Sequence, residues 1–159
     1  ILSNLDTLFG WYIKLDQDFT VDGIGYSGEK VLAPALVFNK VAYYTTYAPS
    51  TTIPADPCDP GNLGVGSLYA VDYKTGEAVI NYDTTNTSDG TNTRSVSSEG
   101  QALLRSDRKM TLGSGIPSGI VVIIGEDGES KLLIGCGGAL CSEETVGGGT
   151  IIPIYWRAR

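Results

Sequence analysis

Short runs of β-branched and aromatic residues, each ended by turn residues, recur along this chain, and no segment shows an apolar period of 3.6 residues. Glycine accounts for 21 of the 159 residues, well above the average of about 7%, and supplies many of the breaks. Strands favour β-branched and aromatic residues, whereas turns favour Gly, Asn, Asp and Pro. The pattern therefore predicts an all-β fold built from antiparallel strands.

Hairpin signals are the clearest local features of the chain. Three hairpins are predicted, over residues 35–46, 67–82 and 119–134. In the first, Asn39–Lys40 forms a two-residue turn, because Asn tolerates the positive φ that such turns require. Its arms are apolar on both sides, so we expect both faces of its sheet to be covered. In the second, Asp72 is placed to accept hydrogen bonds from turn amides, and Gly76 supplies a left-handed residue.

The remaining segments carry weaker patterns. We expect a strand over residues 10–15, an acidic loop over 16–23, a polar excursion over 83–100, a short strand within 103–112, a Gly-rich loop over 135–149 and a final strand over 150–156. The polar excursion is low in complexity, which is typical of an exposed loop.

The chain also shows an internal repeat. The hairpin that follows Pro34 is echoed by the hairpin that follows Pro117, 83 residues further on. Repeated four-stranded units joined by variable loops are typical of β-propeller blades, which take about 40–50 residues each and number at least four in a ring. We therefore expect residues 1–159 to form about two to three antiparallel four-stranded blades of a partial β-propeller.

Composition excludes several classes of function. The chain has 11 Lys and Arg against 18 Asp and Glu, a net charge of −7, so it lacks the basic footprint of a nucleic-acid-binding protein. Its longest uninterrupted apolar run, Ile120–Ile124, is far shorter than the roughly 20 residues that a membrane-spanning helix needs. The chain contains no histidine, which excludes Ser-His-Asp and Cys-His nucleophile systems and His-ligated metals.

An ordered set of short motifs resembles one known family. The motifs are Gly10-Trp11-Tyr12, Gly28-Glu29-Lys30-Val31-Leu32, Tyr43 to Pro49, Asp56-Pro57-Cys58, Gly61, Gly66 to Asp72, Thr75-Gly76, Gly115 to Gly119 and Tyr155-Trp156-Arg157. Together they resemble a stretch of the PilC/PilY family of type IV pilus tip and biogenesis proteins, and they span nearly the whole chain. The motif from Leu68 to Gly76 recurs in many propellers, but the ordered set is more specific.

The resemblance implies a fold, a function and a location. It implies that the chain is the C-terminal portion of a modified β-propeller with no catalytic activity. Family members act at the cell surface with minor pilins, where they support pilus assembly and adhesion. We therefore expect an exported, extracellular, pilus-associated protein whose partners are minor pilins or the upstream part of the same protein.

Members of that family can carry a calcium loop, and this chain departs from its pattern. No D-x-[DN]-x-[DN]-G sequence is present, although such loops need ligands at alternate positions. Asp16, Asp18 and Asp22-Gly23 come closest, but the third acidic residue comes too late. We expect a solvated acidic loop there, and neither a metal nor a cofactor in this chain.

Three cysteines in an acidic, Gly-rich chain favour an oxidising compartment. Cys136 and Cys141 are separated by four residues and could close a small disulfide ring. Cys58 could instead pair with either of them, or with a part of the protein outside this chain. With three thiols and no histidine, a four-ligand zinc site is improbable.

Tyrosine clusters at the end of the first hairpin. Tyr43 and Tyr44 are neighbours in a strand and face opposite sides, so we expect cross-strand packing for one or both. Tyr47 lies at the strand end beside a long loop and is the better candidate for an interface contact. Trp156, in the last predicted strand, is the second candidate.

Two other functions fit parts of the sequence. Quinoprotein dehydrogenases share the Asp72-to-Gly76 type of turn, but they are recognised by adjacent cysteines, which this chain lacks. A structural β subunit of an extracellular filament, held by strand-edge pairing, is the stronger alternative. A partial propeller leaves strand edges uncovered, and such edges recruit other strands. We therefore expect the chain to associate with its own upstream part, with pilins or with copies of itself.

Overall fold

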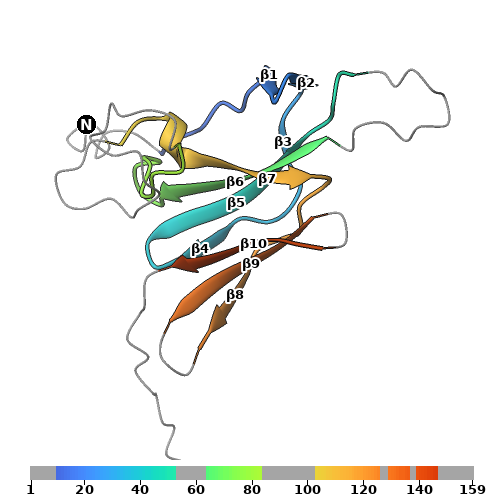
Figure 1. Ribbon diagram of the computed structural model, residues 1–159. Coiled ribbons are helices and arrows are strands. Elements are labelled where there is room, and N and C mark those ends of the chain that lie inside the picture. The colour runs from blue at the N-terminus through green and yellow to red at the C-terminus, as the bar shows by residue number, and fades with distance from the viewer. Residues whose placement is uncertain (1–9, 53–63, 84–102, 126–128, 137–138, 147–159) are drawn as a thin grey trace, which may run out of the picture.

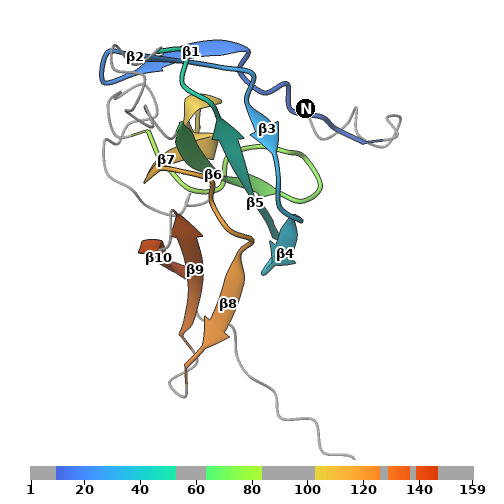
Figure 2. The ribbon, with the colours of Figure 1, turned by 90° about the vertical axis from the view of Figure 1, so that its right-hand side faces the viewer.

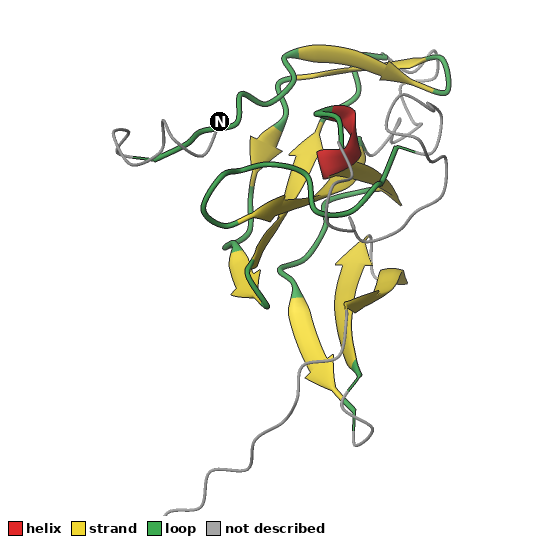
Figure 3. Ribbon diagram, turned by 90° about the vertical axis from the view of Figure 1, so that its left-hand side faces the viewer, coloured by secondary structure: helices red, strands yellow, loops and turns green. Residues whose placement is uncertain are grey.

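The protein is all-β in the computed structural model, which describes residues 10–52, 64–83, 103–125, 129–136 and 139–146 (Figure 1). The strands are β1 (Asp18–Val21), β2 (Ile24–Ser27), β3 (Lys30–Val31), β4 (Leu36–Phe38), β5 (Val41–Ala48), β6 (Val65–Asp72), β7 (Lys109–Ser114), β8 (Val121–Ile124), β9 (Ser130–Cys136) and β10 (Ala139–Val146). One 3-10 turn, η1 (Ser106–Arg108), precedes β7 (Figure 3). Every strand pairing is antiparallel, as predicted.

The larger sheet is an antiparallel meander with four strand positions, or lanes, and β3 and β4 share the outer one. Strand β5 pairs along its whole length with β6, and β6 pairs with β7. The outer lane is interrupted, because β3 pairs with one end of β5 and β4 pairs with the other. The predicted hairpin between β4 and β5 is confirmed, with Asn39 and Lys40 at φ 48° and 66°.

The smaller sheet is also an antiparallel meander, with three strands in the order β10-β9-β8. Its outer lane is also interrupted, because Pro117 forms an isolated bridge with Cys136 before β8 pairs with β9. The predicted hairpin over residues 119–134 is thus confirmed as β8 and β9. The predicted final strand over 150–156 and the polar excursion beyond residue 83 lie outside the described residues.

Residues 10–23 do not form the predicted strand and loop. The segment from Gly10 to Leu15 is extended but belongs to no ladder, and the strand begins only at β1. The expected acidic loop contains a hairpin instead. Asp22 and Gly23, at φ 50° and 79°, form its turn between β1 and β2, since Asp-Gly suits the left-handed positions of a two-residue turn.

Two other expectations need correction, and a third is confirmed in part. The arm expected over 77–82 forms only isolated bridges, including Val71 with Ala78. The short strand expected within 103–112 is present as β7, which begins only after η1 and extends to Ser114. The expected Gly-rich loop around the cysteines contains β10, because Ala139 pairs with Cys136 and starts a new strand there. Glycines at a strand end are compatible with a tight turn, which loop composition alone does not distinguish.

The core follows the alternation of side chains along β5 and β6. One set of side chains (Tyr43, Leu68 and Ala70) faces the smaller sheet and packs with Leu132 and Ile134 of β9. The two sheets therefore lie one above the other (Figure 2).

The opposite set (Ala42, Tyr44, Tyr69 and Val71) is covered by Trp11, Ile13 and Leu15 of the extended segment. Both faces of the larger sheet are thus covered, as predicted, but one cover is a single extended segment. Tyr44 and Tyr69 stack across β5 and β6 with ring centroids 4.9 Å apart, so cross-strand packing is confirmed.

Candidate functional site

Two of the three cysteines chosen from the sequence, Cys136 and Cys141, lie in the smaller sheet. Cys136 is buried at the end of β9 and is disulfide-bonded. Cys141 lies in β10 at a bulge, where the pairing register skips from Leu140 to Ser142. Cys58 and the Cys141 side chain lie outside the described part of the chain, so both predicted pairings stay predictions.

The two aromatic interface candidates differ in what the structure says of them. Tyr47 is half-buried on β5, and a side chain added at Gly64 would meet its hydroxyl at 2.5 Å. Its ring therefore lies against the backbone that leads into β6. Trp156 lies outside the described residues, and a contact role for either residue stays a prediction.

A buried carboxylate joins four parts of the fold. Glu29 is only 4% exposed, and it accepts hydrogen bonds from Thr46 Oγ1 at 2.5 Å and from Tyr69 Oη at 3.3 Å. The backbone N–H of Asp16 donates to it at 3.2 Å. Lys109 Nζ completes the set at 3.1 Å. A buried charge is tolerated only when it is paired and hydrogen-bonded, and Glu29 is both.

The same carboxylate affects the neighbouring tyrosines. Burial, followed by the negative charge of Glu29, raises the pKa of Tyr44 from 10.0 to about 12. The pKa of Tyr69 is raised still further, first by burial and then by Glu29. Both hydroxyls therefore stay protonated at any physiological pH, and Tyr69 remains a donor to Glu29.

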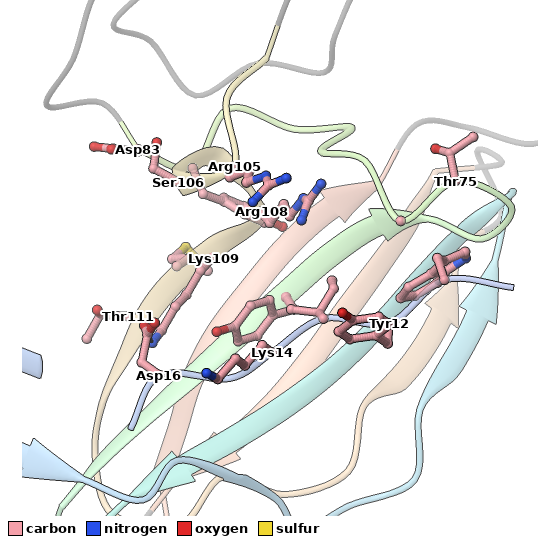
Figure 4. A pocket seen from close by; sticks show the side chains of 16 residues that line it. Tyr12, Lys14, Asp16, Thr75, Asp83, Arg105, Ser106, Arg108, Lys109 and Thr111 are labelled. Atoms are coloured by element: carbon pink, nitrogen blue, oxygen red, sulfur yellow. Dashed lines mark hydrogen bonds and ion pairs between the residues drawn. The ribbon is translucent and has the colours of Figure 1, made fainter. Parts of the chain in front are cut away.

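An open groove lies beside this network (Figure 4). It has a volume of about 990 Å³. One wall is the extended segment with Trp11, Tyr12 and Lys14, and the other is η1 with Arg105 and Arg108. Residues of the larger sheet form its floor. Tyr12 is 90% exposed, so the groove has an aromatic rim that is open to solvent.

Positively charged side chains cluster in the groove, although the chain as a whole is acidic. Four of its lining residues are cationic (Lys14, Arg105, Arg108 and Lys109), out of 11 Lys and Arg in the chain. Lys109 is neutralised by Glu29 and by Asp16, whose Oδ2 lies 3.2 Å away. In the described part of the chain, no carboxylate lies within ion-pair distance of the other three.

Arg108 carries the clearest sign of unmatched charge. Its Nε is buried and has no hydrogen-bond partner among the described residues. Burial, followed by the positive charge of Arg105, lowers the pKa of Arg108, and Tyr44 and Glu77 only partly oppose this. Like charges and an unsatisfied buried donor both cost free energy, so this wall of the groove is suited to an anion.

A second candidate surface is made by the outer lanes of the two sheets. Exposed aliphatic residues follow both lanes: Val31, Leu32 and Val37 on the first, and Val121, Ile123 and Ile124 on the second, all between 47% and 60% exposed. The break between β3 and β4 lies next to the break before β8, because a Cβ added at Gly119 would lie 3.9 Å from Ala33 Cβ. Within the described residues, neither lane pairs with a further strand.

Neither a metal site nor a membrane-spanning helix is found among the described residues. They contain no group of three or more His, Cys, Asp or Glu residues that could hold a metal ion. None of their helices has the length and apolar character to cross a bilayer.

Sequence reasoning missed Glu29, Lys109 and the two groove arginines. A readable signal existed for the arginines, because residues 105–109 place three cations within five positions of an acidic chain. Glu29 gave no such signal. Its burial depends on hydroxyl and ammonium donors that are distant in the sequence.

Comparisons with protein-family models, curated proteins and solved structures found no match to this chain.

Proposed function

We propose that this chain is a non-catalytic docking module: a sector of a β-propeller that supports type IV pilus assembly and adhesion at the cell surface. The observation that carries the docking role is the exposed aliphatic surface of the two outer lanes. Such edges are sites of strand addition unless they are covered.

The repeated plan of the two sheets supports the propeller part of the proposal. Each sheet is an antiparallel meander whose first lane is interrupted, and the two sheets pack face to face through one core. Propeller blades are meanders that pack in this way around an axis. Strands β4 and β8 occupy equivalent positions, since each forms a hairpin with the strand that follows it, so both outer lanes would lie on corresponding sides of neighbouring blades.

The pilus part of the proposal depends on the motif resemblance. Two of its motifs have clear structural roles, since Gly66 to Asp72 lies in β6 and Thr75-Gly76 lies in the following turn. Asp72 Oδ1 accepts hydrogen bonds from the N–H groups of Lys74 and Thr75 at 2.8 and 2.9 Å. These motifs therefore have a backbone role, and the pilus assignment needs an independent test.

The test is a charge placed on the outer lane of the smaller sheet. Ile123→Lys, expressed in a piliated bacterial host, should reduce both surface piliation and co-purification with minor pilins. Thr20→Lys is the matched control, because it adds the same charge at an exposed strand position of a different sheet. Thermal unfolding of both purified variants should match that of the unmodified chain.

Two results would contradict this proposal. Unchanged piliation and pilin binding by the Ile123→Lys variant would remove the docking role of the lane. Ordered self-assembly of the unmodified chain without pilins, lost in the same variant, would favour the structural filament subunit instead.

A further inference from the structure

The extended wall of the groove has an unusual backbone. Residues 10–15 are extended, yet within the described part of the chain they make no backbone–backbone hydrogen bond. The segment is held by side chains, including a hydrogen bond from Trp11 Nε1 to the carbonyl oxygen of Tyr73 at 3.1 Å. A free extended backbone is the template that strand addition requires.

The opposite wall presents two guanidinium groups. Arg105 and Arg108 are three positions apart around η1, and their side chains point the same way, over the groove (Figure 4). In the same view the carboxyl group of Asp83 points away from them. The guanidinium fork matches a carboxylate with two parallel hydrogen bonds.

We infer that this groove binds an extended, carboxylate-bearing peptide segment of a partner protein. The peptide pairs with the backbone of residues 10–15, and one of its Asp or Glu side chains reaches Arg105 and Arg108. Tyr12 and Lys14, on the exposed side of the segment, contact the neighbouring peptide residues.

The charge distribution favours a peptide over a polyanion. The chain carries a net charge of −7, so a nucleic acid or a highly charged glycan is repelled at long range. One carboxylate at a local cationic wall avoids most of that repulsion. The unpaired backbone then favours a peptide, because only a peptide supplies the alternating N–H and C=O groups that complete a ladder. This surface is separate from the outer lanes, and the inference holds whether or not those lanes dock to a pilus.

The experiment measures fluorescence anisotropy of a labelled peptide with the full 159-residue chain. The probe is an extended Thr-rich peptide, about as long as residues 10–15, with one central Glu, and its twin carries Gln in place of that Glu. We expect the Glu peptide to bind and the Gln peptide to bind at least about tenfold more weakly, since hydrogen bonds to charged groups are the stronger class. A version with methylated backbone nitrogens should also lose binding.

Variants of the chain separate the site from general charge effects. R105Q/R108Q should weaken binding at least about tenfold, whereas K30Q/K40Q removes the same charge at exposed positions away from the groove and should leave binding nearly unchanged. R105Q alone changes an exposed residue and should give a partial loss if the double variant fails to fold.

Three outcomes would overturn the inference. One is equal binding of the Glu and Gln peptides, and another is an equal loss in the two double variants. The third is binding of an oligogalacturonate, a carboxylate-bearing saccharide, in the absence of peptide binding.

Discussion

Removing the ammonium of Lys109 should destabilise the fold far more than a surface ion pair would. Its Nζ lies 3.1 Å from Glu29 Oε2, and the Glu29 side chain is 1% exposed. Two unit charges at that distance attract by about 5 kcal/mol at an effective dielectric constant of 20. Since Lys109→Met leaves the carboxylate buried with no cation, we expect the free energy of unfolding to fall by about 3–5 kcal/mol.

Three further variants measure the contribution of the Glu29–Lys109 ion pair to stability. Glu29→Gln should cost less, about 1–2 kcal/mol, because Lys109 is 19% exposed and still has Asp16 at 3.2 Å. The double variant should cost less than the sum of the two single variants, with a coupling of about 2 kcal/mol or more. Asp16→Asn is the control: its side chain is 56% exposed, so the loss should stay below about 1 kcal/mol.

Urea unfolding followed by tryptophan fluorescence gives all four free energies at neutral pH. The reasoning fails if Lys109→Met costs no more than Asp16→Asn, or if the single-variant losses simply add. Either result would mean that water reaches Glu29 and screens its charge.

Three other predictions concern single positions. Gly76→Ala and Gly28→Ala both place a side chain at φ +67°, but only at Gly76 does the new Cβ meet the Trp11 ring, at 2.7 Å. Both should lose about 1–2 kcal/mol from backbone strain, and Gly76→Ala should lose about 1–3 kcal/mol more. Equal urea midpoints would refute the clash. Because the pKa of Tyr44 is raised from 10.0 to about 12, its contribution is complete below pH 10 and is lost as pH rises through 12. It amounts to about 2–3 kcal/mol, so the alkaline fall in stability should be shallower in Tyr44→Phe, and identical profiles would contradict this. Cys136→Ser should lower the thermal midpoint, since it removes a disulfide. Peptide mapping of the unreduced chain should show Cys136 linked to another cysteine, and a free thiol there would count against the bond.

The features that were predictable from the sequence are those fixed by neighbouring residues. Asn39–Lys40 requires no more than a tolerance of positive φ, and Asp72 bonds to amides two and three residues along the chain. The all-β class and the two-face alternation at Tyr43 and Tyr44 also follow from local pattern. Such features need no knowledge of the tertiary partners.

Features set by distant partners were not predictable in this way. Trp11, Ile13 and Leu15 alternate like a strand, but their partners are side chains of β5 and β6 and no ladder forms. Alternation of apolar and polar residues indicates that one face of an extended segment is buried, but it does not show that its backbone pairs with another strand. Conversely, the acidic residues before Gly23 suggested a solvated loop, although Asp-Gly is also a strong hairpin turn.

The candidate site illustrates the same limit. Its arginines are close in sequence, and their clustering could have been noticed. The groove itself depends on the packing of residues 10–15 against a sheet that is completed only by β7. No local pattern encodes that packing.

Residues 10–15, which pair with no strand among the described residues, should give different results in fluorescence and in hydrogen-exchange experiments. Their alternate side chains are packed, so the emission of Trp11 will mark the segment as folded until the sheet itself melts. Their amides have no backbone acceptor among the described residues, so they will exchange with solvent deuterium as fast as those of an open loop. Slowed exchange at these amides would therefore be a direct signal that another strand has arrived beside them.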